Sequence, residues 1–184
     1  MSQRIFTGIG SRETCEKILL AMERVSTDLA ADNFIGRSGK AVGPDQATQA
    51  GFEFCRSLGI DCIFEAYLPN LSFNKHFGSE DWNIVVTDTE IRSKAMAYAA
   101  SVHPAYNKMI PDHRELHIRN VYQILGKDLQ TRSKFVLFSA PETHGVVSGG
   151  TATAVHLARK FDIPTFNFLR NRASNLRKFL AIHT

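Results

Sequence analysis

The feature of this sequence that most constrains its fold is an alternation between short apolar runs and longer amphipathic stretches. Runs rich in β-branched and aromatic residues occupy positions 4–10, 33–39, 60–68, 133–140 and 163–169, and helical periodicity fills most of the intervals between them. Strands that alternate with helices form βαβ units, which build a mainly parallel sheet with helices on both faces. The sequence therefore predicts an α/β fold, in which ligands bind beyond the carboxyl ends of the strands.

The helical stretches carry apolar stripes and recognisable ends. Apolar or small residues recur at spacings of 4, 3 and 4 in the first two: Ile18, Met22, Val25 and Leu29, then Ala47, Gly51, Phe54 and Leu58. Ser11 is a candidate N-cap of the first helix, and Pro44 suits the first turn of the second. We expect Gly59 and Gly126 to end helices, and Ala47 and Gly51 to let their helix lie close to the sheet.

Residues 70–132 interrupt the alternation. Positions 89–102 and 112–126 are both helical in pattern, and Leu116, Val121 and Ile124 or Leu125 are expected to face inward in the second. The interval 70–88 predicts irregular structure, apart from a short strand over 82–86. We therefore expect one domain over residues 1–184, with a helical insertion at about 70–132.

Composition bounds the class of protein. Of the 184 residues 43% are hydrophobic and 22% charged, which is typical of a globular domain, and the apolar runs are too short to span a membrane. The first residues lead straight into a strand without the pattern of a secretion signal, so we expect a cytoplasmic location. Cys15, Cys55 and Cys62 are odd in number and form no CxxC motif, which favours reduced thiols.

The charge of the chain favours anionic partners. The net charge is +4 with a pI near 9.1, which suits a phosphorylated ligand or a polyanion. Many basic residues lie in the last third of the chain, especially in the run 170–178. That run predicts either the solvated face of an amphipathic helix or a nucleic-acid surface. We further expect a homo-oligomer, and no membrane among the partners.

Three expected strand-to-helix turns are unusually poor in side chains: TGIGSRE at 7–13, RSGKAVGPD at 37–45 and VVSGGTAT at 146–153. In a parallel sheet all three lie at the same edge, where each exposes backbone N–H groups that favour anions. A ligand that carries phosphate is the leading interpretation, and tight connections without a ligand are the alternative. GIGSRE lacks the third glycine of GxGxxG and no GxxxxGKS/T occurs, which excludes an ordinary NAD dehydrogenase and a P-loop NTPase.

The order of these three turns resembles the SLOG superfamily, which includes the DNA-processing protein DprA and the LOG nucleotide phosphoribohydrolases. DprA-like proteins carry an SGGA-x-G-x-D-x-x-A motif, whose positions are filled here by Ser38, Gly39, Ala41, Gly43, Asp45 and Ala47, while Lys40 replaces the second glycine. The stretches HPAYNKM at 103–109 and RNVYQILGKDL at 119–129 resemble small, often phage-encoded members. The resemblance covers most of the chain and implies a Rossmann-like nucleotide-binding fold. It makes His103, Arg119 and Asn120 candidates for a lid over the ligand, whereas the residues alone are equally compatible with packing and capping groups.

Departures from the family pattern limit what the resemblance implies. LOG hydrolases share a PGGxGTxxE motif with a catalytic glutamate, and residues 148–156 align with it. His156 stands in place of that glutamate, and the proline and the third glycine are missing, so cleavage by the family residues is not implied. We also find no counterpart of the flanking domains of DprA, so loading of single-stranded DNA is not implied either.

The residues expected to bind the ligand come from the three turns and from the insertion. They are Gly8, Gly10, Ser11, Arg12, Ser38, Gly39, Lys40, Gly43, Asp45, Arg119, Asn120, Gly149, Gly150, Thr151 and Thr153. Arg12 would pair with phosphate, or else with Glu13 or Glu16 at the surface. Asp45 would hold a ribose hydroxyl or act as a general base, or else cap its helix. The lysine and the two threonines would contact phosphate, or else serve as an ordinary loop lysine and as helix caps.

Other polar groups receive a structural interpretation. His113 and His117 are four residues apart, as in zinc sites, but HRELH is not HExxH and no third ligand is evident. We therefore expect surface histidines, no metal and no cofactor. Trp82 lies beside Glu80 and Asp81, and it would either stack on a base or be partly buried, which is commoner for a tryptophan in a loop.

Three functions are compatible with these patterns. We favour binding of a nucleotide, a nucleotide sugar or an ADP-ribose-like molecule by a sensor or sequestering protein, because the catalytic LOG glutamate is missing. The second is an enzyme that cleaves or transfers at an N-glycosidic bond, with Asp45 or Glu65 as the carboxylate near the ribose. The third is binding of single-stranded nucleic acid, from the resemblance to DprA and the basic pI.

Overall fold

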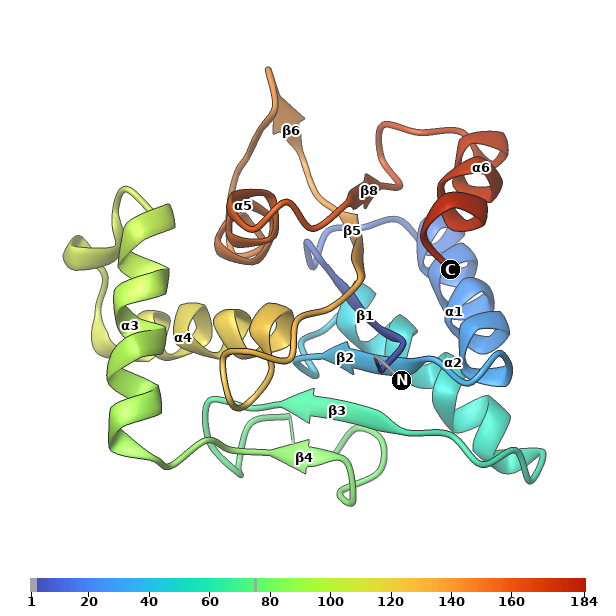
Figure 1. Cartoon of the computed structure of the whole chain (residues 1–184), viewed down its shortest axis with the longest axis horizontal. Coiled ribbons are helices and arrows are strands. Elements are labelled where there is room, and N and C mark those ends of the chain that lie inside the picture. The colour runs from blue at the N-terminus through green and yellow to red at the C-terminus, as the bar shows by residue number, and fades with distance from the viewer. Residues whose placement is uncertain (1–2, 75) are drawn as a thin grey trace.

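The computed structural model describes residues 3–74 and 76–184, and it confirms the α/β fold (Figure 1). Six strands form one parallel sheet in the order β4-β3-β2-β1-β5-β8. Their bounds are Ile5–Gly10 (β1), Ile35–Ser38 (β2), Phe64–Tyr67 (β3), Asn83–Ile84 (β4), Phe135–Ser139 (β5) and Thr165–Asn167 (β8). Each of them lies within a run that the sequence predicts as a strand.

Six α-helices accompany the sheet in the described residues, and all six were predicted. Their bounds are Glu16–Ala31 (α1), Pro44–Ser57 (α2), Thr89–Val102 (α3), Pro111–Leu125 (α4), Ala152–Lys160 (α5) and Ala173–His183 (α6). A 3-10 turn, η1, spans Tyr106–Lys108, and a small antiparallel hairpin joins β6 (Glu142–Thr143) to β7 (Val146–Val147). The sequence patterns predicted neither of these two short features.

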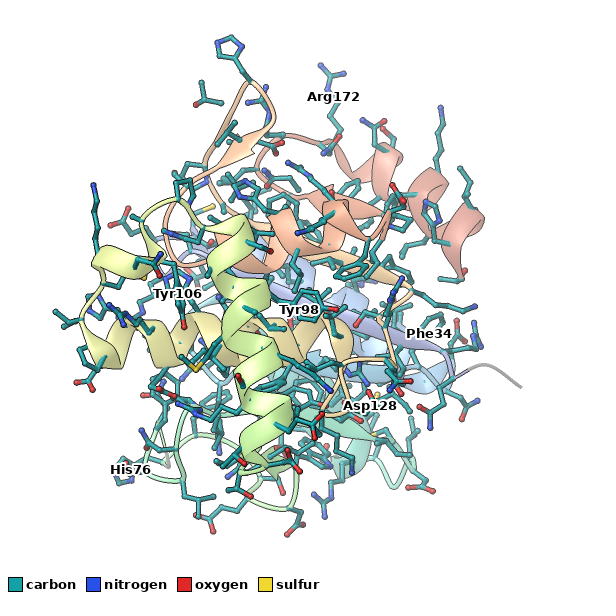
Figure 2. All side chains as sticks on the ribbon, turned by 60° about the vertical axis from the view of Figure 1, so that its left-hand side comes forward. Phe34, His76, Tyr98, Tyr106, Asp128 and Arg172 are labelled. Carbon is teal, nitrogen blue, oxygen red and sulfur yellow. The ribbon has the colours of Figure 1, made fainter. Side chains whose placement is uncertain are left out.

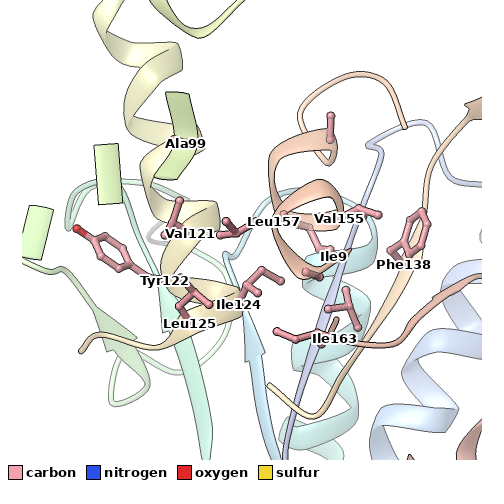
Figure 3. Close-up of a cluster of buried hydrophobic side chains, with 14 of the residues drawn as sticks. Ile9, Ala99, Val121, Tyr122, Ile124, Leu125, Phe138, Val155, Leu157 and Ile163 are labelled. Atoms are coloured by element: carbon pink, nitrogen blue, oxygen red, sulfur yellow. The ribbon is translucent and has the colours of Figure 1, made fainter. Parts of the chain in front are cut away.

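The helices form one layer on each face of the sheet. In Figure 1, α3 and α4 lie to the left of the strands, and α1 and α6 lie to the right. Phenylalanines dominate the core beneath α1, α2 and α6, among them Phe6, Phe34, Phe52, Phe64, Phe135 and Phe166. Aliphatic residues and alanines dominate the core beneath α3, α4 and α5, where Ile9, Val121 and Leu157 pack together (Figure 3). The segment 70–132 is therefore helical as expected, and its two helices supply most of one covering layer.

The order of the strands places a crevice beside β1. The chain runs outward from β1 through β2, β3 and β4, and then crosses back through α3 and α4 to place β5 on the other side of β1. Neighbouring strands whose connections leave in opposite directions create a switch point, and open parallel sheets bind ligands there. The turns after β1, β2 and β5 all reach this edge.

Helix α2 lies directly against β1 because two strand residues lack a side chain. A methyl group on Gly8 would lie 2.0 Å from Thr48 Oγ1, and one on Gly10 would lie 2.5 Å from Pro44 Cγ. Gly51 has a different role from the one expected. A methyl group there would lie 2.5 Å from the carbonyl oxygen of Glu23, so this glycine lets α2 approach α1 and not the sheet.

Some helix details differ from the expectations. α1 begins at Glu16 with Cys15 as its N-cap, so Ser11 precedes the helix and does not cap it. Phe54 of α2 and Leu58, the residue that follows the helix, are exposed, because α2 turns Phe52 and Cys55 toward the core instead. Both faces of this helix carry apolar residues, so periodicity alone could not select the buried one.

Two features at the periphery concern the expectations for Trp82 and for the basic run at 170–178. Trp82 is buried against Phe64, with the guanidinium of Arg56 over its ring, so it does not form an exposed base-stacking platform. Arg172 of the basic run before α6 is exposed and points away from the body of the protein (Figure 2). Across residues 3–74 and 76–184, no helix combines the length and the apolar composition needed to cross a membrane.

Candidate functional site

A cavity of about 500 Å³ opens at the switch point, beyond the carboxyl ends of β1, β2 and β5. Residues of all three side-chain-poor turns line it together with one face of α4. The lining residues are Ile9, Gly10, Ser11, Arg12, Glu13, Ala41, Asp45, His113, Leu116, His117, Arg119, Asn120, Pro141, Ser148, Gly149, Gly150 and Thr151. The three turns thus meet at one cavity, as their common edge predicts.

The first turn is held rigidly and carries an exposed arginine. The backbone N–H of Ser11 donates to the carbonyl oxygen of Ser139 at 2.7 Å, and the hydroxyl of Thr14 donates to Ser11 O at 2.8 Å. Arg12 lies exposed in the cavity lining. Among the described residues it forms no ion pair, so the expected alternative of pairing with Glu13 or Glu16 is not what holds it.

The second turn buries Asp45 at the floor of the cavity. Its Oδ2 accepts hydrogen bonds from the backbone N–H of Gly39 at 3.1 Å and of Ala41 at 3.4 Å, and from Arg119 Nη1 at 3.3 Å. Its Oδ1 has no partner among the described residues. Burial raises the pKa of Asp45, while the Arg119 guanidinium and the backbone amides of Ala41, Gly39 and Gly10 act in the opposite direction. Asp45 therefore stabilises the turn through Oδ2, while Oδ1 can still accept a hydrogen bond.

Arg119 reaches the same floor from α4. It is 5% exposed, its Nη1 also donates to the carbonyl oxygen of Gly39, and its guanidinium lies 5.6 Å from the ring centre of Phe73. Its Nε has no partner among the described residues. A methyl group on Gly39 would lie 1.4 Å from Nη1, so this position is glycine in order to admit the arginine. Gly39 is expected from its turn to approach a phosphate, whereas in the structure it packs against Arg119.

The third turn offers backbone donors to the cavity. Gly149, with φ +76°, Gly150 and Thr151 precede the first residue of α5, and a methyl group on either glycine would meet nothing within 4 Å. Within the described part of the chain, the N–H groups of these three residues have no acceptor. Asn120 Nδ2 fixes the turn by donating to Gly150 O at 2.7 Å. Several unpaired N–H groups at the start of a helix form a site that favours anions.

His117 is expected from its spacing to be a surface histidine, and this expectation is wrong, because α4 packs it into the cavity lining against α5. It is only 7% exposed, lines the cavity, and its Nδ1 lies 2.7 Å from the Oγ1 of Thr153. The ring of His103 meets it edge-on at 4.6 Å between ring centres. Burial, together with His103, Arg119 and His113, lowers the pKa of His117 to about 4. The available signal was the set of polar residues that alternate with Ile118 and Val121 in the buried second half of α4, namely His117, Arg119, Asn120 and Gln123.

Several predicted ligand residues lie outside the cavity lining. Ser38 donates to the carbonyl oxygen of Gly8 at 2.6 Å, deep in the sheet. Gly43 has a φ of +96° and packs against the backbone of Ser11. Thr153 is fully buried and contacts His117. These residues support the walls of the cavity and do not face its interior.

Lys40 also points elsewhere. Its φ is +61°, a left-handed conformation that favours glycine, which is the residue of the DprA-like motif at this position. Its side chain is buried, and Nζ donates to Asn83 Oδ1 at 3.1 Å, beside β4. The charge that Lys40 adds to the turn therefore does not reach the cavity.

Two further side chains considered for chemistry are engaged away from the cavity. Glu65 pairs with Arg37, Nε to Oε2 at 2.5 Å, and accepts a hydrogen bond from the Tyr67 hydroxyl at 2.9 Å. His156 occupies the position of the LOG glutamate, and its Nε2 accepts from the N–H of Val147 at 3.2 Å. Neither lines the cavity, and among the described residues that do, Asp45 is the one buried carboxylate.

The chain matches no known protein family, and no curated protein is significantly similar to it. Among solved structures it is similar to DNA processing protein A from Helicobacter pylori, which binds single-stranded DNA. The two are 13% identical with a TM-score of 0.47, and the match covers 90% of this chain. This chain spans 65% of the length of that one. So distant a likeness adds nothing about function to what the sheet and the cavity show.

Proposed function

We propose that the protein binds a nucleotide or a nucleotide-derived ligand in the switch-point cavity. The observation that carries the proposal is the meeting of three turns and a buried, incompletely partnered Asp45–Arg119 pair at one cavity. Its volume of about 500 Å³ falls within the range of roughly 300–1,000 Å³ common for small-molecule sites.

The third turn suits the phosphate of such a ligand. The N–H groups of Gly149, Gly150 and Thr151 would donate to its oxygens, and the open space above both glycines lets the group approach the backbone. Arg12 at the rim would add a charged, bidentate donor. A phosphate would thereby supply the acceptors that these groups lack.

Asp45 and Asn120 suit the sugar. Asp45 Oδ1 and Asn120 Oδ1 are both buried acceptors without a donor among the described residues. Ribose hydroxyls are donors of the right kind, and a buried acceptor left unpaired costs about 1–3 kcal/mol. The favoured ligand therefore carries both an anionic group and a sugar with free hydroxyls.

Binding is tested with a defined panel. We would measure thermal shifts and calorimetric affinities for the four nucleoside monophosphates, ADP-ribose, UDP-glucose, ribose 5-phosphate and adenosine. We expect at least one phosphate-bearing compound to bind, and Arg12→Ala to weaken it about tenfold. Arg177→Ala, an exposed arginine on α6, is the matched control and should leave the affinity unchanged. No binding by any member of the panel would remove the proposal.

Nucleic acid is an arm of the same experiment. A protein that holds a single strand through its phosphates loses affinity steeply as salt rises, whereas a buried nucleotide site depends on salt much less. A fluorescent single-stranded oligonucleotide titrated at low and high salt would separate the two. Tight, salt-sensitive binding that Asp45→Asn leaves unchanged would favour a nucleic-acid surface over the cavity.

A second candidate function is cleavage of an N-glycosidic bond, and the free oxygen of Asp45 favours it. A carboxylate whose pKa is raised by burial is a better general base near neutral pH. Asp45 would take a proton from a water molecule as the water oxygen attacks C1′. The bond between C1′ and the base breaks with its electron pair going to the base, which then takes up the proton from Asp45 directly or through solvent. Chromatography of each monophosphate after incubation would show free base and ribose 5-phosphate, and Asp45→Asn would abolish both.

Three expectations stay predictions beside this proposal. They are a homo-oligomeric state, a cytoplasmic location and a phage origin. Light scattering on the purified protein measures the first of them directly.

A further inference from the structure

We propose that His117 binds the anionic group of the ligand through a proton held on Nε2, as an uncharged donor beside the third turn. This inference rests on the proposed function and adds a residue to the site that neither the three turns nor the family motifs contain. Its basis is the way α4 lies along the start of α5.

The position of His117 places it next to the proposed phosphate. Asn120, three residues further along α4, donates to the carbonyl oxygen of Gly150, and His117 contacts Thr153, three residues beyond Gly150. Both side chains of α4 thus bracket the turn that carries the unpaired N–H groups. His117 lines the cavity, and with Nδ1 engaged by Thr153 it is Nε2 that remains available there.

The hydrogen-bond network fixes which nitrogen carries the proton. Thr153 is fully buried, and within the described residues its hydroxyl has no hydrogen-bond partner other than His117 Nδ1. If Nδ1 carried the proton, the hydroxyl proton of Thr153 would be buried without an acceptor, which costs about as much as a lost hydrogen bond. Thr153 therefore donates to Nδ1, and the imidazole carries its own proton on Nε2.

The surroundings keep the ring neutral as well as oriented. Burial and the nearby His103, Arg119 and His113 lower the pKa of His117 to about 4, so the ring is uncharged at neutral pH. A neutral ring whose Nδ1 accepts from Thr153 presents a donor to the cavity, with no lone pair on Nε2 to repel an anion.

The ring can be observed without any ligand. Nitrogen-15 NMR of the imidazoles distinguishes protonated from unprotonated ring nitrogens, and His117→Gln identifies the signals by their loss. We expect one ring with Nε2 protonated and Nδ1 unprotonated from pH 8 down to about pH 5. A proton on Nδ1 of His117 would overturn the inference whatever the protein binds.

The contact with the anion is tested with matched probes. We would measure affinities of the wild type, His117→Ala and His117→Gln for AMP, ribose 5-phosphate and adenosine. Removing a donor to a charged group costs roughly tenfold or more in affinity, so His117→Ala should weaken AMP and ribose 5-phosphate alike and leave adenosine unchanged. Glutamine places an amide N–H near the position of Nε2, so His117→Gln should recover most of the loss.

A supporting variant tests the role of Thr153. Thr153→Val keeps the shape of the residue and removes its hydroxyl, which frees the ring to turn. We expect a loss of about threefold for AMP, and none in addition when the same change is made on His117→Ala, because the two residues act as one unit.

The outcomes separate this inference from the proposed function. If AMP and ribose 5-phosphate bind and His117→Ala leaves both affinities unchanged, the function stands and the inference is overturned. An equal loss for adenosine would also overturn it, since His117 would then contact the sugar or the base. If none of the probes binds the wild type, the proposed function fails together with the role of His117 in it.

Discussion

Among the described residues, two arginine–carboxylate pairs contain a buried arginine, and they differ in whether their atoms are fully partnered. Arg37 and Glu65 lie opposite each other on β2 and β3, with 2.5 Å between Nε and Oε2. Arg37 also donates to the carbonyl oxygen of Thr131, and Tyr67 donates to Glu65. Every polar atom of Arg37, Glu65 and Tyr67 that is closed off from solvent has a partner in the described structure.

The second pair, Arg119 and Asp45, has both side chains buried, whereas Glu65 of the first pair is partly exposed, and yet it is left incomplete. Its two atoms are 3.3 Å apart, and neither Arg119 Nε nor Asp45 Oδ1 finds a partner among the described residues. Buried side-chain atoms without a partner are also found on six neighbouring residues between positions 103 and 123. They are His103, Tyr106, Arg114, Asn120, Tyr122 and Gln123.

This difference distinguishes a structural pair from a candidate site. Buried polar groups in folded proteins are normally satisfied, and each exception needs a reason such as a ligand, a catalytic role or an ordered water. The buried atoms of the Arg37–Glu65 pair are all hydrogen-bonded, as expected of a structural group. This pair joins β2 and β3 to the segment before β5. The Arg119 pair keeps unused donors and acceptors at a cavity, which is what a binding site requires.

The largest expected effect is on stability and concerns the saturated pair. Arg37→Met leaves the Glu65 carboxylate and the Thr131 carbonyl without their common donor, so the free energy of unfolding should fall by about 3 kcal/mol. Urea denaturation followed by circular dichroism measures it. Arg56→Met is the matched control, because it breaks an exposed pair with Asp81 and should cost about 1 kcal/mol or less. Equal losses for the two variants would contradict a special role for the buried pair.

The next effect concerns the incomplete pair, where we expect a large loss of ligand affinity and only a small loss of stability. Arg119→Met should lower the affinity for the best-binding nucleotide of the panel more than tenfold, because the arginine holds Asp45 at the cavity floor. It should cost only about 1–2 kcal/mol of stability, since Asp45 can bind a proton and the cavity admits water. Calorimetry and urea denaturation on the same samples give both numbers. Unchanged affinity with a loss of 3 kcal/mol would place the two pairs in one class.

The sheet, the helices and the edge where the turns meet were largely predictable from sequence, because local patterns and connectivity determine them. Apolar runs predicted five strands of the sheet, the short pattern at 82–86 predicted β4, and helical periodicity predicted the six helices of the described residues. Glycine-rich turns in a parallel sheet must meet at one edge, so the cavity and most of its lining in the turns followed from connectivity. Phe54 and Leu58 were assigned wrongly to the core because α2 carries apolar residues on two faces.

The side-chain contacts around Arg119 and His117 were harder to predict, because they join residues far apart in the chain. Gly39 admits Arg119, which is 80 positions away, and no local pattern reveals that pairing. His117 has the spacing of a surface histidine on a helix, and only the packing of α4 against α5 buries it. Lys40 fills a glycine position of the family motif, and its side chain turned toward β4 instead of the ligand edge.

A smaller effect is expected from substitution of Gly39, which follows β2 and lies between Arg37 and Asp45 in the sequence. Gly39→Ala would place a methyl group 1.4 Å from Arg119 Nη1, so the arginine must leave Asp45. We expect a loss of about 1–2 kcal/mol in stability and a weaker form of the Arg119→Met effect on affinity. Gly59→Ala is the control: its methyl group meets nothing within 4 Å, and its φ of +77° limits the cost to backbone strain of about 1 kcal/mol. A Gly39→Ala variant with wild-type affinity would contradict the assigned role.

The smallest effect is the pH dependence of the incomplete pair, and its sign follows from the raised pKa of Asp45. A carboxyl group with a higher pKa in the folded state binds protons more tightly there, so its contribution to stability is complete below the ordinary pKa of 3.8 and is lost as the pH rises through the folded pKa. Asp45→Asn has no carboxyl group to titrate. Between the unfolded and folded pKa values of Asp45, its free energy of unfolding should therefore rise relative to that of the wild type, and at higher pH the difference should stay constant.

In an Arg119→Met background this pH range should extend to higher pH, because the guanidinium no longer lowers the pKa of the Asp45 carboxyl group. A difference that narrows as the pH rises would show that Arg119 and the backbone amides outweigh burial, and Asp45 would then be as fully compensated as Glu65.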